Sequence, residues 1–174
     1  MEIFSLNKIK ALIQNDTGIL FCFGTSFISR IIAAKTRLAE TELVPTHVAL
    51  IVNGKFLYES TSQPEKLGNK TIPAGVRRYL LKDFYKLETK KNTTYAFYPC
   101  SVNNDKLEKY IHYPYGKDLI LDLLLTDGSD GESKGLICSQ YANVVTGLMD
   151  SPCPTPAMMY RFVNSMEDKL NDLL

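Results

Sequence analysis

The chain has 174 residues, with 20 Lys and Arg against 19 Asp and Glu and a formal net charge of +1. This length fits one domain, and the balanced charge excludes the cationic excess with which proteins usually bind a nucleic-acid backbone. Apolar residues make up 45% of the chain, and 10 Gly and 8 Pro are too few for a disordered or fibrous protein. We therefore expect a single domain over residues 1–174 and no nucleic-acid partner.

The N-terminal residues predict a cytoplasmic location. They include an acid, Glu2, where a secretory signal would be basic, and no long apolar block follows. The uncharged apolar stretch Thr17–Ile28 is far shorter than the about 20 residues that a membrane span needs, so no transmembrane segment is expected. In a reducing compartment the four cysteines are expected to be thiols rather than a disulfide framework.

Three elements are expected in the first 38 residues. Apolar residues at helical spacing predict a helix over Ser5–Asn15, and a glycine-bounded apolar run predicts a buried strand over Gly18–Gly24. Thr25 or Ser26 offers an N-cap oxygen to an amphipathic helix over Phe27–Leu38. Three cations on its polar face are explained by solvation, and contact with anionic lipid is the alternative.

The dipeptide Asn53-Gly54, between two apolar runs, is the strongest hairpin signal in the chain. It predicts strands over Thr46–Val52 and Lys55–Ser60. Aromatic and β-branched residues predict two further strands over Gly75–Leu80 and Thr93–Tyr98, separated by a charged segment. These strands together predict a mainly antiparallel sheet.

Helical patterns occupy much of the second half of the chain. The expected helices lie at residues 103–110, 117–125, 136–145 and 165–174. Between two of them, Thr126–Gly135 holds three Gly and three acids, which predicts a mobile loop. This loop leads directly into the helix that contains Cys138.

Cys138 stands in the first turn of that expected helix. Unpaired backbone N–H groups and the positive end of the helix dipole favour a thiolate there, which is how a protein makes a sulfur nucleophile. A buried thiol that packs as a small apolar residue between Ile137 and Tyr141 explains the position equally well. Position alone leaves both interpretations open.

A thiolate nucleophile needs an imidazole to hold its charge and to protonate a leaving group, and the chain has two histidines. His112 lies in a turn-like segment, Ile111–Tyr115, where an exposed ring is the ordinary explanation. His47 lies at the start of an apolar strand, where a satisfied core or edge histidine is the alternative. His47 is therefore the better candidate.

Glu59 can fix the tautomer of His47 if the hairpin register brings the two side chains together. A two-residue loop, Asn53-Gly54, places His47 opposite Ser60 and turns Glu59 to the other face. A three-residue loop, Val52–Gly54, places His47 opposite Glu59. The catalytic hypothesis requires the second register.

Metal ions and cofactors have no motif in this sequence. The four Cys and two His form no CxxC or HxxxH pair of the kind that binds zinc. The phosphate-binding patterns GxGxxG and GxxxxGK[ST] do not occur, and neither does the GxSxG nucleophile elbow. We therefore expect no metal and no cofactor.

Five short segments follow one another in the order of a known family. They are Gly18–Phe21, Ser29–Ile32, Thr46–Leu50, Leu57–Ser60 and Cys138–Gln140. On these residues the sequence resembles the permuted papain-like amidases, the YiiX-type, circularly permuted branch of the NlpC-type cysteine peptidases, which are related to lecithin retinol acyltransferase-like enzymes. The chain departs from the family pattern at Ile19, Ala49 and Gln140, none of which is a catalytic group.

The resemblance implies an α+β, circularly permuted papain-like fold, in which an antiparallel, partly closed sheet packs against helices and the nucleophile begins a helix. It implies that Cys138 is the nucleophile, that His47 acts as general base and then acid, and that Glu59 orients the imidazole. The implied activity is that of a cysteine hydrolase, an amidase or peptidase that works through an acyl-enzyme. A short peptide or isopeptide amide is the first expected substrate and a lipid ester the second.

Two other functional classes stay open. One is a catalytically silent binding module that keeps the fold and uses the loop at 126–135 as a lid over a ligand. The other is a membrane-surface protein that contacts anionic lipid through Phe27–Leu38, because peripheral contact needs no transmembrane segment. The sequence leaves the oligomeric state open.

Overall fold

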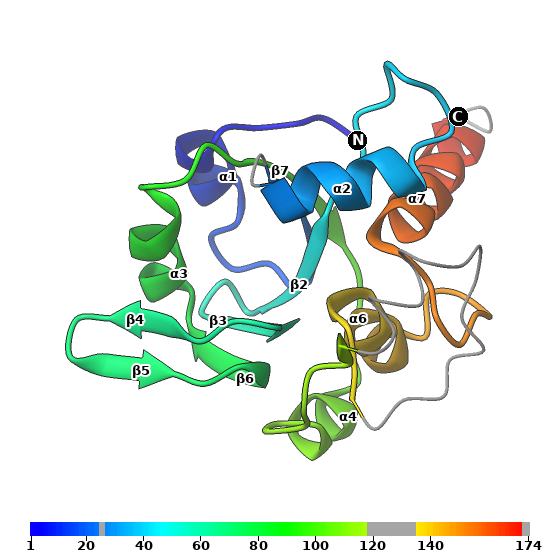
Figure 1. Ribbon diagram of the computed structural model, residues 1–174. Helices are drawn as coiled ribbons and strands as arrows, with labels where there is room; N and C mark the ends of the chain where they lie inside the picture. The colour runs from blue at the N-terminus through cyan, green and yellow to red at the C-terminus, as the bar shows by residue number, and fades with distance from the viewer. Residues whose placement is uncertain (25–26, 118–134, 172–174) are drawn as a thin grey trace.

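The computed structural model describes residues 1–24, 27–117 and 135–171, and these form an α+β architecture around one main sheet (Figure 1). The sheet has five antiparallel strands in the order β6-β3-β2-β1-β7. Its strands are β1 Gly18–Phe23, β2 His47–Val52, β3 Phe56–Thr61, β6 Gly75–Leu80 and β7 Thr94–Pro99. A short hairpin of β4 Glu65–Leu67 and β5 Lys70–Ile72 projects beyond the β6 edge.

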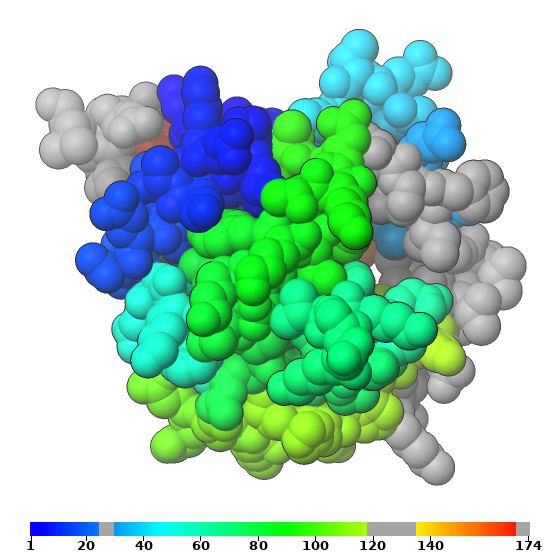
Figure 2. All heavy atoms as spheres, turned by 90° about the vertical axis from the view of Figure 1, so that its left-hand side faces the viewer, coloured from blue at the N-terminus to red at the C-terminus, as the bar shows by residue number. Residues whose placement is uncertain are grey.

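Helices cover both faces of the main sheet. One face carries α1 Leu6–Leu12 and α3 Leu81–Glu88, and α3 lies between α1 and the β4–β5 hairpin on the surface shown in Figure 2. The other face carries α4 Asn104–Lys109, α6 Cys138–Thr146 and α7 Pro156–Asn171, and α2 Phe27–Thr36 packs against α7. No helix in the described stretches is long and apolar enough to cross a membrane.

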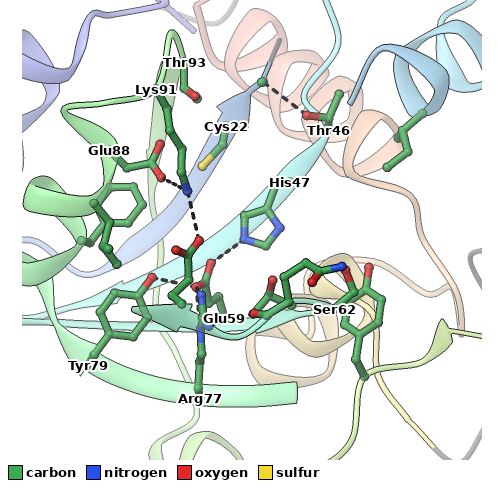
Figure 3. A pocket seen from close by; sticks show the side chains of 18 of the residues that line it. Cys22, Thr46, His47, Glu59, Ser62, Arg77, Tyr79, Glu88, Lys91 and Thr93 are labelled. Atoms are coloured by element: carbon green, nitrogen blue, oxygen red, sulfur yellow. Dashed lines mark hydrogen bonds and ion pairs between the residues drawn. The ribbon is translucent and has the colours of Figure 1, made fainter. Parts of the chain in front are cut away.

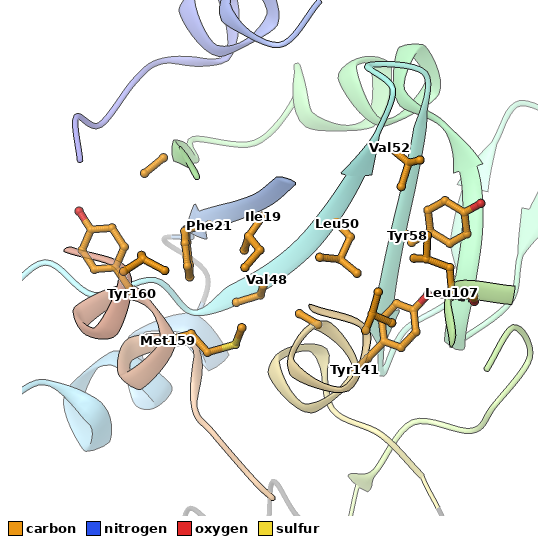
Figure 4. Packing of buried hydrophobic residues seen from close by; sticks show 14 of the residues in the cluster. Ile19, Phe21, Val48, Leu50, Val52, Tyr58, Leu107, Tyr141, Met159 and Tyr160 are labelled. Atoms are coloured by element: carbon orange, nitrogen blue, oxygen red, sulfur yellow. Dashed lines mark hydrogen bonds between the residues drawn. The ribbon is translucent and has the colours of Figure 1, made fainter. Parts of the chain in front are cut away.

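The central strands are apolar on both sides because both sides are covered. Successive side chains of a strand point to opposite faces. In β2, Val48 and Leu50 pack toward α6 and α7, in the cluster shown in Figure 4, whereas Ala49 and Ile51 pack toward α1 and α3. This double burial explains why β1 and β2 appear in the sequence as continuous apolar runs.

The α+β class, the antiparallel sheet and the five predicted strands of that sheet are confirmed. The permuted papain-like arrangement stays a prediction. The helix expected at 117–125 and the loop expected at Thr126–Gly135 lie outside the described residues, apart from Lys117 and Gly135. The two expected N-cap residues, Thr25 and Ser26, lie outside them as well.

Two helices differ from the sequence prediction. The charged segment between β6 and β7 contains α3, whose buried residues Leu81, Phe84 and Glu88 recur at helical spacing. The last helix begins at Pro156 rather than at Ser165. Proline suits a first helical position because the missing N–H would have no partner there, and the hydroxyl oxygen of the preceding Thr155 accepts the Met158 N–H at 3.1 Å.

The turn between β2 and β3 depends on Gly54. Asn53 and Gly54 have φ values of 54° and 57°, in the left-handed region that glycine adopts at least cost. The Gly54 N–H donates to the Asp16 carbonyl at 2.8 Å, so the turn is held against the segment before β1. A Cβ at this position would lie 2.1 Å from the Gln14 carbonyl oxygen. Close packing therefore adds to the conformational requirement for glycine.

Replacing Gly54 by alanine should destabilise the protein more than the same change at Gly68. Gly68 has φ 61° but nothing within 4 Å of a Cβ, so Gly68→Ala tests the backbone conformation alone, at about 1–2 kcal/mol. Gly54→Ala adds a backbone clash of about 1–3 kcal/mol. Urea unfolding of both variants measures the difference. Equal losses of unfolding free energy would show that the turn can move away from Gln14.

Candidate active site

His47 is the first residue of β2 and lies where the sheet ends. The Thr46 N–H before it donates to the Cys22 carbonyl at 2.9 Å, which fixes the start of the strand against β1. The imidazole is 28% exposed, and its Nε2 lies 2.6 Å from Oε2 of Glu59. The structure therefore brings together the histidine and the carboxylate that the sequence analysis selected.

The hairpin register that produces this contact is neither of the two predicted ones. The loop consists of Asn53, Gly54 and Lys55, so Val52 pairs with Phe56 and Glu59 lies opposite Ala49. His47 is two residues from Ala49 and points to the same face. Histidine and glutamate are therefore diagonal neighbours, a separation that two long side chains can bridge. The expectation that His47 needs to lie directly opposite Glu59 was wrong.

Glu59 is 5% exposed and its two carboxylate oxygens have different partners. Oε2 faces His47, as described above. Oε1 accepts hydrogen bonds from Arg77 Nε at 2.9 Å, from Arg77 Nη2 at 2.6 Å and from the Tyr79 hydroxyl at 2.7 Å (Figure 3). Arg77 and Tyr79 come from β6, the edge strand that pairs with β3.

The charge of Glu59 is maintained by these partners. Burial raises the pKa of a carboxylic acid, but the hydrogen bond and charge of His47, the charge of Arg77 and the hydrogen bond from Tyr79 outweigh it and hold the pKa of Glu59 well below its usual range. The carboxylate is therefore ionised at neutral pH and accepts a hydrogen bond from the imidazole in a fixed direction.

Cys138 is the first residue of α6, whose start is tied to the sheet and to the chain after the helix. The hydroxyl of Ser60, on β3, donates to the Leu136 carbonyl at 2.5 Å. The Gln140 side chain accepts the Ile137 N–H at 3.2 Å and donates to the Pro152 carbonyl at 3.3 Å. The amide oxygen of Gln140 thus caps the start of the helix, and its amide N–H group anchors the helix to the chain that follows it.

The Cys138 sulfur meets the start of β2. The His47 side chain and the backbone N–H groups of Val48 and Ser139 lie close enough to the thiol to act on its pKa. Burial alone raises the pKa of a thiol, but the charge and hydrogen bond of His47, with the two N–H groups, lower the pKa of Cys138 below its ordinary value of 9.0.

The same contacts shift the pKa of His47 in the opposite direction, upward. Burial alone lowers the pKa of an imidazole, but the charge and hydrogen bond of Cys138 and those of Glu59 outweigh it and raise the pKa of His47 to about 10. A lowered pKa at the thiol and a raised pKa at the imidazole both favour the charged forms of the two groups, a thiolate beside an imidazolium. This pair, with Glu59 behind the ring, is arranged for nucleophilic chemistry.

A cavity of about 490 Å³ opens beside this group on the α3 side of the sheet. His47, Glu59 and Arg77 line it together with Tyr115, and a charged cluster forms another part of its wall (Figure 3). In that cluster Lys91 Nζ lies 2.8 Å from Glu88 and 3.2 Å from Glu65. Cys138 is 5% exposed and is not among the described lining residues.

The second histidine lies elsewhere. His112 has φ 71° in the turn before Tyr113, and its N–H donates to the Val76 carbonyl at 2.8 Å. It is exposed and does not line the cavity. The described residues contain no group of three His, Cys, Asp or Glu side chains placed to hold a metal ion.

Sequence reasoning missed three residues of this site: Arg77, Tyr79 and Cys22. Arg77 and Tyr79 stand at alternate positions of a predicted strand, which is a signal that both side chains share a face. Cys22 pairs with His47 across β1 and β2 and lines the cavity, and burial raises the pKa of its thiol well above the ordinary value. Only Cys138 of these two thiols has the contacts that stabilise a thiolate.

Comparison of the chain with protein-family models, with curated proteins and with solved structures gave no match.

Glu59→Gln should lower the pKa of His47 from about 10 toward its ordinary 6.5, because the variant keeps a hydrogen-bond acceptor and removes the negative charge. The chain has two histidines, so imidazole NMR signals can be assigned and titrated individually. The His112 signal is the internal control, because this residue lies outside the cavity and has no contact with Glu59 among the described ones. An unchanged His47 titration would mean that the Glu59 charge does not act on the ring.

Proposed function

We propose that this protein is a cysteine hydrolase that acts by acyl transfer, with an amide or isopeptide bond as its first substrate class. The proposal assigns Cys138 as the nucleophile, His47 as the acid and base, and Glu59 as the group that orients the imidazole. The observation that carries it is the row of Cys138, His47 and Glu59: Glu59 lies 2.6 Å from His47 Nε2, and His47 lowers the pKa of Cys138 at the start of α6.

The proposed chemistry follows from the different partners of the two imidazole nitrogens. Nε2 faces Glu59, which leaves Nδ1 for the sulfur. The thiolate attacks the carbonyl carbon, and backbone N–H groups at the start of α6 stabilise the oxyanion. The intermediate collapses as its C–N bond breaks, and His47 gives its proton to the leaving nitrogen. Water, deprotonated by His47, then attacks the thioester, which releases the acid and restores Cys138.

The fold supports the same proposal. In the permuted papain-like arrangement the histidine strand precedes the cysteine helix in the chain, and β2 precedes α6 here. The helix also lies against β2 and β3, the strands that carry His47 and Glu59. We therefore assign the chain to that fold as part of the proposal.

The cavity favours a polar substrate over an acyl chain. Its wall carries the paired charges of Glu65, Glu88 and Lys91 close to His47 and Glu59. Burying a hydrocarbon chain against these groups would remove them from water without new hydrogen bonds, whereas a peptide supplies partners. A lipid ester, processed by the same three residues, is the alternative substrate.

One observation favours a second candidate, a catalytically silent binding module. Cys138 is only 5% exposed, so a substrate carbonyl has little direct access to its sulfur in this conformation. In that case the cavity would hold a ligand and the ion pair would serve the structure. The two candidates differ in whether Cys138 reacts.

Cys138 should react with iodoacetamide at mildly acidic pH at least about tenfold faster than Cys22, Cys100 or Cys153, because the charge of His47 and nearby backbone N–H groups lower the pKa of its thiol. Burial, by contrast, raises the pKa of Cys100 to about 11. Peptide mass mapping after short exposures gives the rate at each cysteine. His47→Ala should remove the preference for Cys138.

Turnover separates the enzyme from the binding module. A panel of fluorogenic peptide and isopeptide amides should be hydrolysed by the unmodified protein and not by Cys138→Ser, whose hydroxyl is a far weaker nucleophile. Cys100→Ser is the matched control and should keep full activity. Equal labelling of all four cysteines would refute the proposal, and full hydrolysis by Cys138→Ser would refute it independently.

A further inference from the structure

Arg77 is a buried cation that lines the cavity. It is 4% exposed, and its Nε and Nη2 both donate to Oε1 of Glu59. Two N–H groups of a planar guanidinium on one carboxylate form a strong, directional contact that an ammonium group cannot reproduce. The position of the Glu59 carboxylate therefore depends on Arg77.

The remaining end of the guanidinium is also fixed. Arg77 Nη1 donates to the Gln63 carbonyl at 3.2 Å and to the Pro73 carbonyl at 3.4 Å. These two carbonyls flank the β4–β5 hairpin, one before β4 and one after β5. The side chain thus joins the base of the hairpin to Glu59, and the backbone on both sides prevents its rotation.

We propose that Arg77 is the positioning residue of the site: it holds Oε1 of Glu59 so that Oε2 is directed at His47, and its charge offsets that of the carboxylate. This inference rests on the proposed function, because it concerns the same ion pair. Arg77 acts through Glu59 and takes no part in bond making or breaking. Tyr79 assists by donating a third hydrogen bond to Oε1.

The charge of Arg77 has a definite effect on the ion pair. With Arg77 present, the row Cys138 thiolate, His47 imidazolium, Glu59 carboxylate and Arg77 guanidinium is neutral. Without it, the row carries one net negative charge. A removed cation raises the pKa of every neighbouring acid, so both the thiol of Cys138 and the imidazolium of His47 should lose their protons at higher pH.

Other titratable groups face the same cavity from neighbouring elements. They are Cys22 of β1, Glu65 of β4, Glu88 of α3, Lys91 after α3, and Tyr115. Lys91 is paired with both glutamates. Substitution of Arg77 leaves all of them in place, so a shift between variants reports the Arg77 charge.

The test is the pH dependence of iodoacetamide alkylation at Cys138, measured by peptide mass mapping. Arg77→Met, which has a similar length and no charge, should move the midpoint of the alkylation profile upward by about one pH unit. Arg78→Met is the matched control. Arg78 is the next residue on β6, is exposed, and pairs with Glu108 away from the site. Its profile should coincide with that of the unmodified protein.

Glu59→Gln and Arg77→Lys complete the test. Glu59→Gln removes the opposite charge, so it should move the midpoint downward, a change of sign that general destabilisation cannot produce. Arg77→Lys keeps the positive charge and loses the paired N–H groups of the guanidinium, so its shift of the alkylation midpoint should be less than half that of Arg77→Met. If Arg77→Met does not fold, Arg77→Lys still tests the proposal.

The two proposals fail in different ways. Slow alkylation of Cys138 in the unmodified protein would overturn the proposed function itself. Fast alkylation with profiles of Arg77→Met and Arg77→Lys that match the unmodified protein would overturn only the role of Arg77. An upward shift in Arg78→Met equal to that in Arg77→Met would also overturn it, because the effect would then not depend on contact with Glu59.

Discussion

A buried carboxylate is the constraint around which this protein is organised. Removing an ionised carboxylate from water costs several kcal/mol unless charged and hydrogen-bonding partners replace the lost solvent. Glu59 receives those partners from two strands: the imidazole of β2 and the guanidinium and phenol of β6. Strand β3 is therefore held to both neighbouring strands by the hydrogen bonds and ion pairs of Glu59 as well as by backbone hydrogen bonds.

The Cys138 sulfur lies next to this group, and its surroundings favour a further negative charge there. Its location at the start of α6 supplies backbone N–H groups, and the imidazole supplies a cation, so two weak acids that would be neutral in isolation are stabilised in their charged forms. Neither side chain would have these properties alone. The pair is a product of the docking of α6 against the sheet.

The sequence was sufficient to predict most of the sheet and the contact of His47 with Glu59. The strands are recognisable because burial on two faces leaves continuous apolar runs, and Asn53-Gly54 specifies a tight turn. The register was not predictable, because the extra loop residue, Lys55, is held by a distant contact: the Leu81 N–H donates to its carbonyl at 2.8 Å. That contact depends on α3, whose few apolar residues lie in a strongly charged segment, so the sequence did not indicate a helix there.

Arg77 and Tyr79 escaped prediction for a related reason. Their contact with Glu59 follows from the β3–β6 register, which places Glu59 directly opposite Arg77. A separate hairpin of unpredicted length lies between these strands in the chain. Local patterns show that residues 77 and 79 share a face, but only the folded topology shows which side chain they meet.

The residues of the row come from both layers of the molecule. His47 and Glu59 point to the side of the sheet covered by α1 and α3, whereas α6 packs on the opposite side and reaches the imidazole only because β2 begins at His47. An unfolded or partly assembled chain therefore holds an ordinary thiol. The lowered pKa of Cys138 therefore requires that α6 and the start of β2 are both in place.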